Sequence, residues 1–279
     1  MGRVTGRRRV VRIRDGAAVE RVDTLAGEEP LEIRVNGESL AVTMRTPGDD
    51  FALAAGFLVS EGVVGRAAEL ARMAYCAGTD EDGRNTYNVV DVRLADGVPV
   101  PGFSARRHVY TTSSCGLCGK ATLEAVRTTA RWPLTEGPLL TPRVLAGLPD
   151  RLRAAQRVFE RTGGLHAAAL CSADGELLDV REDVGRHNAV DKVVGRALQR
   201  DALPLAGTVL LVSGRASFEL VQKAVMAGIP VLAAVSAPSS LAVDLAEDAG
   251  LTLVGFLRGA SMNVYTGAQR LGLPSPGAD

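Results

Sequence analysis

Short apolar runs alternate with helix-like segments from Thr141 to about residue 258, and this alternation constrains the fold more than any other feature. The runs that read as strands are apolar on both faces: "TVLLVSG", "IPVLAAVSA" and "LTLVGFLRG". The segments between them, "ASFELVQKAVMAG" and "SSLAVDLAEDAG", read as helices. Such strands, joined by helices, are typical of a parallel sheet covered on both sides. The sequence therefore predicts an α/β architecture for this half of the chain.

The stretch before these strands carries further helix and strand signals. Thr141 is placed to cap a helix over about 142–160, with Pro142 in its first position. The apolar "TGGLHAAALC" predicts a strand that returns through the turn "SADGE" into "LLDVRED". In "NAVDKVVGRAL", apolar residues recur at helical spacing. Asn188 followed three positions later by Asp191 predicts a capping box at the start of this helix.

The first hundred residues predict a smaller α+β unit. Asn36-Gly37 stands between two alternating runs, which is a strong signal for a β-hairpin. Asp49 or Asp50 can cap a helix that ends near Gly62, and "TYNVVDVRL" predicts another strand. Residues 1–26 are rich in arginine and predict a loose arm with at most one edge strand.

A linker-like stretch, "ADGVPVPGFS", follows this unit. It predicts a division into a small α+β domain over 1–108 and an α/β domain over 109–279 that is headed by a cysteine-containing loop.

Charge and hydropathy exclude some classes of function. Lys and Arg number 32, as do Asp and Glu, so the overall balance does not favour a polyanion such as nucleic acid as a partner. The N-terminus has no apolar stretch of the length of a secretory signal, and no run of 18 apolar residues predicts a membrane-spanning helix. We therefore expect a cytoplasmic protein.

The α/β pattern also predicts where a ligand binds. Ligands on such sheets lie at the carboxyl ends of the strands, where this chain has the loops 213–217, 236–240 and 256–261. Serines that precede helices offer backbone N–H groups to an anion, and Arg215 and Arg258 can add bidentate hydrogen bonds. A phosphate-bearing ligand is one interpretation; ordinary serine caps with surface arginines are the other.

The segment "TTSSCGLCGK" holds Cys115 and Cys118 as a C-x-x-C pair. A structural zinc site needs four ligands, and the chain has no second C-x-x-C pair or H-x-x-x-H motif. A redox dithiol and two incidental buried cysteines are further interpretations. A sulfur carrier is the fourth: flanking glycines give the loop freedom, and Lys120 can stabilise a thiolate.

Several other side chains are candidates for minor roles. We expect His187 to line a sulfur-transfer cavity, His166 to be hydrogen-bonded and partly buried, and His108 to lie at the surface. Asp49 and Asp50 are best explained as helix caps. Cys76 and Cys171 are expected to be inert, with Cys171 buried.

Taken together, the motifs resemble those of a known family. "TPGDDFALAAGFLVSEG", "SSCGLCGK", "TGGLHAAAL", "EDVGRHNAVDK", "VSGRASFELVQKA", "GIPVLAAVSAPSSLAVDLAE" and "LVGFLRG" occur in the order of the FdhD family. The members of this family are accessory sulfurtransferases required for active formate dehydrogenase. The resemblance covers all but the arginine-rich start and the last dozen residues.

The resemblance implies a function. The protein would accept sulfur from a cysteine desulfurase and transfer it to the molybdenum or tungsten cofactor in its bis(molybdopterin guanine dinucleotide) form, before that cofactor enters formate dehydrogenase. Cys115 would carry the persulfide and Cys118 would assist it. The cofactor is cargo in this scheme, and no permanently bound metal is implied. The nucleotide-binding stretch would consist of Phe256, Leu257, Arg258, Gly259, Ala260 and Ser261.

The resemblance further implies a homodimer and a three-layer, cytidine-deaminase-like fold for the larger domain. Zinc deaminases need the motif H-x-E with a later P-C-x-x-C. Here the nearest match is His166-Ala167-Ala168, and the C-x-x-C comes before it, so deaminase activity is not expected. A cofactor-binding chaperone without sulfur transfer and a C-x-x-C dithiol oxidoreductase stay as alternatives to the sulfur carrier.

Overall fold

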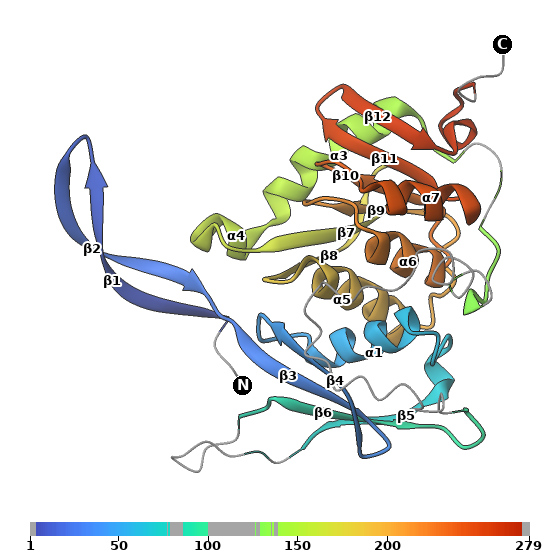
Figure 1. Cartoon of the computed structure of the whole chain (residues 1–279), viewed down its shortest axis with the longest axis horizontal. Helices are drawn as coiled ribbons and strands as arrows, with labels where there is room; N and C mark the ends of the chain where they lie inside the picture. The colour runs from blue at the N-terminus through green and yellow to red at the C-terminus, as the bar shows by residue number, and fades with distance from the viewer. Residues whose placement is uncertain are drawn as a thin grey trace.

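The computed structural model describes residues 4–76, 78, 86–99, 126, 129–134, 136 and 139–274. These residues form two main sheets, helices between and outside them, and a projecting hairpin (Figure 1). The first half contains β1 (Thr5–Arg14), β2 (Ala17–Ala26), β3 (Glu29–Val35), β4 (Glu38–Arg45), α1 (Asp50–Ser60), η1 (Ala67–Glu69), β5 (Leu70–Tyr75) and β6 (Val89–Leu94). The second half contains α3 (Pro142–Ala155), α4 (Arg157–Thr162), β7 (His166–Ser172), β8 (Leu177–Asp183), α5 (Arg186–Gln199), β9 (Thr208–Val212), α6 (Phe218–Met226), β10 (Val231–Ala234), α7 (Ser240–Asp248), β11 (Thr252–Arg258), β12 (Ser261–Thr266) and η3 (Ala268–Leu271).

The larger sheet has the strand order β12-β11-β10-β9-β7-β8. Its strands β9, β10 and β11 are parallel, as predicted, and are connected through α6 and α7. The sheet as a whole is mixed, however, because β7 runs antiparallel to β8 and β9, and β12 runs antiparallel to β11. The turns between β7 and β8 and between β11 and β12 are too short for the crossover that parallel neighbours require. The prediction of a parallel sheet therefore holds only for its three central strands.

The smaller sheet has the order β4-β3-β6-β5. The predicted hairpin at Asn36-Gly37 is confirmed, and both residues have positive φ values, 52° and 86°, which suit a two-residue turn of type I′. Strand β6 is also confirmed, whereas β5 was not predicted. The residues of β3 alternate between buried and partly buried positions, so one face of this sheet packs on the core.

Helices α1 and α5 lie between the two sheets, as Figure 1 shows. A Cβ added at Gly56 would collide with the backbone of Asp191, and one at Gly195 with the backbone of Ala52. The two helices therefore touch through their backbones at these glycines. A single cluster of buried side chains runs from Ile33 in the smaller sheet to Val212 in the larger one. The predicted division near residue 108 stays a prediction, since 100–125 lie outside the described residues.

Buried charges lie next to this helix crossing. The ammonium group of Lys223 on α6 lies 2.7 Å and 2.8 Å from the two carboxylate oxygens of Asp191 on α5. Ser60 at the end of α1 donates to the same carboxylate at 2.8 Å. A buried charge is tolerated only when it is paired and hydrogen-bonded, so this cluster fixes three helices relative to one another.

The predicted capping box of α5 is wrong. The helix begins at Arg186 with Gly185 as its N-cap, so Asn188 lies inside the first turn. The Asn188 amide instead donates to the carbonyl of Met44 at 2.7 Å and to Asp183 at 2.9 Å. Asn188 therefore uses its side chain for a tertiary hydrogen bond to Met44 and not for capping the helix.

The two aspartates expected to cap α1 do not do so through their side chains. Asp49 occupies the N-cap position with φ 56° and makes no side-chain cap; its carboxylate pairs with Arg181 at 3.0 Å. Asp50 is buried and accepts two hydrogen bonds from the buried guanidinium of Arg45, at 3.1 and 3.0 Å, and one from Tyr75. Burial, followed by the charge of Asp50, raises the pKa of Tyr75 to about 12.

Helix α3 covers the other face of the larger sheet. Its buried residues Leu145, Leu148 and Leu152 pack in a second cluster with residues of β7 and β9. Thr141 and Pro142 stand at its start as predicted. No described helix is both long and apolar enough to cross a membrane.

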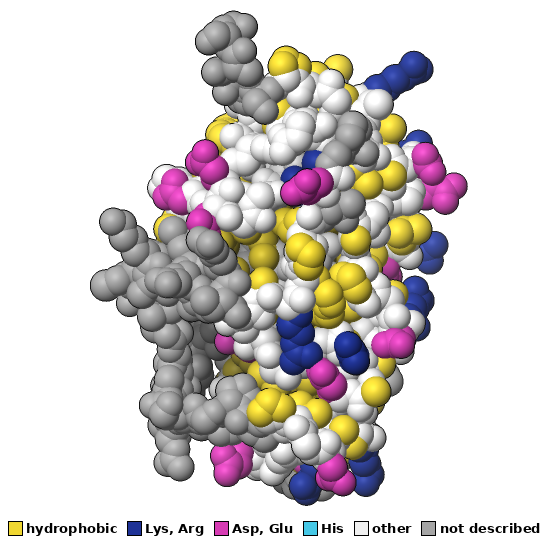
Figure 2. Space-filling model, turned by 90° about the vertical axis from the view of Figure 1, so that its right-hand side faces the viewer, with side chains coloured by type: hydrophobic (Ala, Val, Ile, Leu, Met, Phe, Trp, Pro, Cys, Tyr) yellow, Lys and Arg dark blue, Asp and Glu magenta, His cyan; other side chains and the backbone are white. Residues whose placement is uncertain are grey.

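The arginine-rich start is more ordered than expected. Residues 5–26 form a complete hairpin, β1–β2, that projects from the body of the molecule (Figure 1). On the face away from this hairpin, side chains of both charge signs are interspersed with apolar ones (Figure 2). The mixture agrees with the equal numbers of acidic and basic residues in the chain.

The helix crossing supports a prediction about stability. Gly195→Ala should lower the free energy of unfolding by about 1–3 kcal/mol, because the added methyl group forces the α1 and α5 backbones apart. Gly147→Ala is the matched control: Gly147 lies in α3, and a Cβ added there would meet no atom within 4 Å, so it should raise stability by about 0.5–1 kcal/mol. Urea denaturation measures both; equal effects would contradict the close crossing.

Candidate functional site

Strand direction brings several chain segments to one edge of the larger sheet. Because β7 is antiparallel to both of its neighbours, the carboxyl ends of β8, β9, β10 and β11 share this edge. Helices α5, α6 and α7 begin here, directly after these strands. The free N–H groups at helix starts carry partial positive charge, so the edge is suited to an anionic ligand.

The structure brings together the three predicted ligand loops. Ser236 donates its N–H to the carbonyl of Gly214 at 3.3 Å, and Phe256 donates to that of Ser236 at 3.1 Å. The stretch 256–261, however, is not a loop throughout. Residues 256–258 still belong to β11, and a tight turn at Gly259, φ 52°, leads into β12. Ser217 and Ser239 precede α6 and α7, but only Ser239 caps its helix with its side chain.

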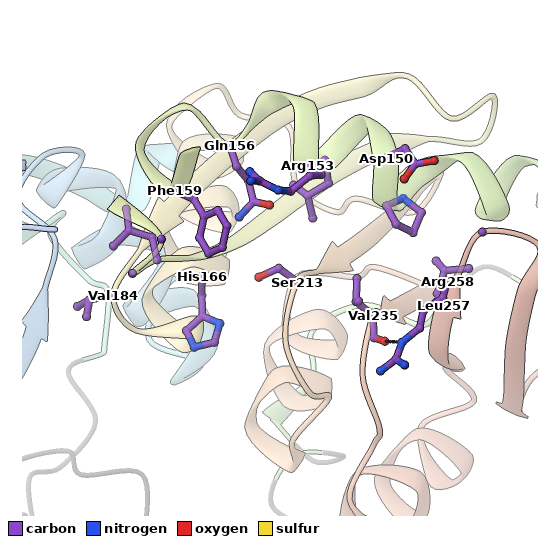
Figure 3. A pocket seen from close by; sticks show the side chains of 16 residues that line it. Asp150, Arg153, Gln156, Phe159, His166, Val184, Ser213, Val235, Leu257 and Arg258 are labelled. Carbon is purple, nitrogen blue, oxygen red and sulfur yellow. Dashed lines mark hydrogen bonds between the residues drawn. The ribbon is translucent and has the colours of Figure 1, made fainter. Parts of the chain in front are cut away.

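An open pocket of about 740 Å³ lies at this edge, on the side of the sheet that α3 covers. One wall comes from α3 and the following turn and helix, and the other comes from the strand ends (Figure 3). The lining residues are Pro149, Asp150, Leu152, Arg153, Gln156, Phe159, Gly163, Gly164, Leu165, His166, Val184, Ser213, Val235, Leu257, Arg258 and Gly259. Two arginines against one aspartate make this lining favourable to an anion.

The helical wall of the pocket forms because the helix is interrupted at Gln156. A continuous helix over 142–160 was expected, but Gln156 has ψ 73° and separates α3 from α4. The cause is tertiary: the N–H groups of Val158 and Phe159 donate to the carboxylate of Glu182 on β8, at 2.9 and 2.7 Å. The start of α4 is thereby held against the sheet, and Phe159 lines the pocket.

An aromatic ring and a guanidinium group meet on this wall. The Arg153 guanidinium carbon lies 4.6 Å from the centre of the Phe159 ring, within cation–π range. In Figure 3 Arg153, Gln156 and Phe159 stand opposite His166 and Ser213. A flat ring system with a charged substituent finds both stacking and hydrogen-bonding groups here.

On the strand side, Arg258 and His166 are the ionisable groups. Arg258 is exposed, and its Nε donates weakly to the carbonyl of Val235 at 3.4 Å, so its terminal nitrogens are available to a ligand. His166 begins β7 and is half-buried. Burial and then the positive charge of Arg186 lower the pKa of His166 below its usual range, so it is neutral at pH 7. The buried Nε of Arg186 has no hydrogen-bond partner among the described residues.

His187 lies on the other side of this edge and does not line the pocket. Its Nε2 lies 3.2 Å from the hydroxyl of Ser217 and 3.7 Å from the carboxylate of Glu219. The nearby imidazole of His187 is the main cause that lowers the pKa of Glu219 to about 2. Because one ring nitrogen faces both the hydroxyl and the carboxylate, the three residues do not form a catalytic relay.

The remaining predicted residues have mixed positions. Leu257, Arg258 and Gly259 line the pocket, while the exposed Phe256, Ala260, Ser261 and Arg215 do not. Cys115, Cys118 and His108 lie outside the described residues. Cys171 is fully buried, and burial raises the pKa of its thiol to about 12, which agrees with an inert thiol. Cys76 is half-buried.

Two further observations concern metal chemistry. Within the described ranges, no three His, Cys, Asp or Glu side chains gather in a way that could hold a metal ion. Ala168, the third residue of the His166-Ala167-Ala168 stretch that was compared with the H-x-E motif, is fully buried in β7.

Sequence reasoning missed most of the helical wall, namely Arg153, Gln156 and Phe159. No motif marks these residues, since a polar stripe and a single aromatic ring are ordinary on a surface helix. The contact between Glu182 and the start of α4 holds Phe159 against the strand ends, and this contact cannot be read from the sequence.

The fold and this pocket define an α/β protein with an open pocket, lined by two arginines and an aromatic ring, at the carboxyl ends of its strands. The family model described as FdhD/NarQ matches residues 26–272, and full-length relatives share most of their residues with this chain. The chain belongs to the FdhD/NarQ family.

Two curated relatives are named "Sulfur carrier protein FdhD". The one from Streptomyces avermitilis is 74% identical over 280 residues, covering 100% of this chain and 99% of the relative. The one from Mycobacterium tuberculosis is 58% identical over 275 residues, covering 97% and 100%. A crystal structure from Desulfotalea psychrophila, described as a formate dehydrogenase accessory protein, superimposes with a TM-score of 0.74 at 27% identity and covers 96% of this chain and 100% of that one.

The surroundings of His166 support a prediction about its titration. The pKa of His166 should be lower in the folded protein than in the unfolded chain. This group therefore stabilises the folded protein at pH values above its unfolded pKa, and the stabilisation is lost as pH falls below that pKa. Arg186→Gln should raise the pKa of His166, because it removes a nearby positive charge. NMR titration of the ring protons measures this. Arg215→Gln on a neighbouring loop is the control and should leave the titration unchanged; equal shifts in both variants would contradict the assignment.

Proposed function

We propose that this protein is a sulfur carrier in the maturation of formate dehydrogenase. Family membership supports this proposal most strongly, together with the names of the curated relatives and of the solved accessory protein. The C-x-x-C pair supplies the thiols that such a carrier needs. A cysteine desulfurase is the proposed donor and formate dehydrogenase the proposed client.

The proposed sulfur transfer begins at Cys115. Its thiolate attacks the terminal sulfur of a persulfide on the donor, the donor's S–S bond breaks, and the donor leaves as a thiol. Cys115 then holds the persulfide. Once the acceptor is bound, attack by the Cys118 thiolate on the inner sulfur of that persulfide delivers sulfide to the acceptor and leaves a disulfide between the two cysteines; without the acceptor the persulfide stays on Cys115. The two thiols thus supply the two electrons that reduce sulfane sulfur to sulfide.

The proposed acceptor is the molybdenum or tungsten cofactor with its two guanine dinucleotides, bound as cargo at the pocket. The pocket volume, about 740 Å³, is in the usual range for a ligand site. Arg258 and Arg153 are suited to phosphate oxygens, and the Phe159 ring to a base. Leu257 and Gly259 complete the strand side. The other members of the predicted stretch, Phe256, Ala260 and Ser261, and the nearby Arg215 would contact a ligand that extends beyond the pocket.

We also infer a cytoplasmic homodimer.

The cytidine-deaminase-like assignment of the larger domain is supported by a mixed sheet with helices on both faces. The hydrolytic chemistry of that class is not proposed, because Ala168 supplies no carboxylate.

Sulfur loading tests the carrier role. After incubation with a cysteine desulfurase and cysteine, intact-mass analysis should show one added sulfur atom, mapped to the peptide 111–120. Cys115→Ser should abolish this addition, whereas Cys118→Ser should retain it, because the persulfide forms on Cys115. Cys171→Ser, at a buried thiol, is the control and should load normally.

The alternatives give different results in the same assay. A cofactor-binding chaperone without sulfur transfer would show no added sulfur and would activate formate dehydrogenase even as Cys115→Ser. A dithiol oxidoreductase would require both thiols and would cycle through an intramolecular disulfide without gaining mass.

Nucleotide binding tests the pocket separately. Arg258→Ala should weaken binding of GDP by about tenfold or more, because a charge-assisted hydrogen bond to phosphate is lost. Arg153→Ala should also weaken it. Arg200→Ala, at an exposed arginine outside the pocket, is the matched control. Isothermal calorimetry measures all three; unchanged affinity in both pocket variants would overturn the placement.

A further inference from the structure

The hairpin β1–β2 forms an arm whose apolar side chains are exposed to solvent in the monomer. It projects from the body (Figure 1) and touches it near its base, where Arg161 lies 3.4 Å from the hydroxyl of Thr5. Large apolar side chains on the arm are exposed: Val11 63%, Ile13 73%, Val19 61%, Val22 56% and Leu25 43%. An isolated two-stranded hairpin is marginally stable in water, so an ordered arm of this composition calls for a partner.

The arm lies ahead of the part of the chain that the FdhD/NarQ model matches, which begins at residue 26. The relative from Streptomyces avermitilis, however, aligns over the whole of this chain. Because the family model does not include the arm, the role of the arm is considered separately from the function of the family.

Both long edges of the arm have unpaired backbone groups, since β1 and β2 pair only with each other among the described strands. The edge of β1 is unsuited to a second copy of itself. Five of its ten residues are arginines, at positions 7, 8, 9, 12 and 14. Antiparallel self-pairing centred on Val10 sets Arg8 against Arg12, and pairing centred on Val11 sets Arg8 against Arg14. Like charges directly opposite destabilise a sheet, so this edge is protected.

The edge of β2 is self-complementary in one register. When two copies pair antiparallel about a twofold axis at Val22, Arg21 of each copy lies opposite Asp23 of the other. The same register sets Val22 against Val22 and Val19 against Leu25. Registers centred on Arg21 or Asp23 would bring two like charges together. Hydrogen-bonded and non-hydrogen-bonded pairs alternate along the hairpin, starting with a hydrogen-bonded pair next to the two-residue turn at Asp15-Gly16. By this alternation Val22 is in a non-hydrogen-bonded pair with Arg9, so its N–H and C=O groups point to the free edge of β2.

We propose that the arms of two copies pair along β2, centred on Val22, to form a continuous four-stranded antiparallel sheet. In this arrangement each tip reaches the base of the other arm, and the two bodies lie at opposite ends of the sheet. Pairing covers the free edge of β2 and brings together apolar side chains that the monomer exposes. Arg21 and Asp23, which pair at 3.4 Å within the monomer and are more than 40% exposed, join a four-charge cluster.

Charge reversal on the full chain tests the register. Arg21→Asp should weaken the dimer by about tenfold, because the new carboxylate faces Asp23 of the other copy at two symmetric places. Asp23→Arg should do the same. The double variant Arg21→Asp/Asp23→Arg restores opposite charges and should restore the dimer. Sedimentation equilibrium measures the dissociation constants, and thermal melting checks that each variant folds.

Cysteine cross-linking gives an independent measure. Val22→Cys should form a disulfide-linked dimer with copper phenanthroline as oxidant, because opposite residues of a hydrogen-bonded pair lie about 5.5 Å apart at Cα, within disulfide range. Thr24→Cys is the matched control; its copies would lie roughly 13 Å apart along the strands and should not link. Mass spectrometry identifies the linked peptide, since the chain has four native cysteines.

Three results would overturn the proposal. The first is a full chain that is monomeric at micromolar concentration, which would leave the arm to some other partner. The second is a dimer that neither charge reversal weakens. The third is equal cross-linking of both cysteine variants. If the chain is a dimer that neither charge reversal weakens, the homodimer inferred under the proposed function stands, and only the arm is excluded as its interface.

Discussion

The crossing of α1 and α5 is the contact on which the rest of the structure depends. Gly56 and Gly195 let the two backbones touch, so that residues of both sheets share one buried core. The paired charges of Asp191 and Lys223 lie beside the crossing and tie α6 to it. Because an unpaired charge would be costly in this interior, the cluster holds α5 and α6 in one arrangement. The starts of these helices, which form part of the ligand edge, are fixed by the same contacts.

Strand direction then explains why residues distant in the sequence converge on one site. β7 runs against its neighbours, so its first residue, His166, lies beside the chain that leaves the end of β9, at the same edge as the end of β10. The break at Gln156 adds the second wall, because Glu182 on β8 binds the free N–H groups at the start of α4. The pocket is thus built from a helix pair and strand ends that only the folded sheet brings together. Its two arginines and its aromatic ring suit the nucleotide part of the proposed cargo.

The proposed function divides its tasks between separate parts of the chain. A thiol that collects sulfur needs access to a donor protein, whereas a nucleotide site needs a rigid frame and fixed donors. The pocket stands on strand ends and helices whose positions the core determines. The arm has neither role; its apolar side chains and its charge pattern concern association between copies.

The sequence by itself determined the types of most elements. Periodicity predicted the central strands β9, β10 and β11 with their helices, Asn36-Gly37 predicted the hairpin, and the quoted motifs pointed to the family. It did not determine β5, β12 or the arm, whose strands lack uninterrupted alternation, nor the uses of Asp50, Asn188 and Gln156. Local rules assign such polar residues to caps and helix interiors, because a short segment offers them no other partners. The tertiary structure decided otherwise, since Tyr75, Met44 and Glu182 are distant in the sequence from Asp50, Asn188 and the start of α4, and they meet these segments only once the sheets have packed.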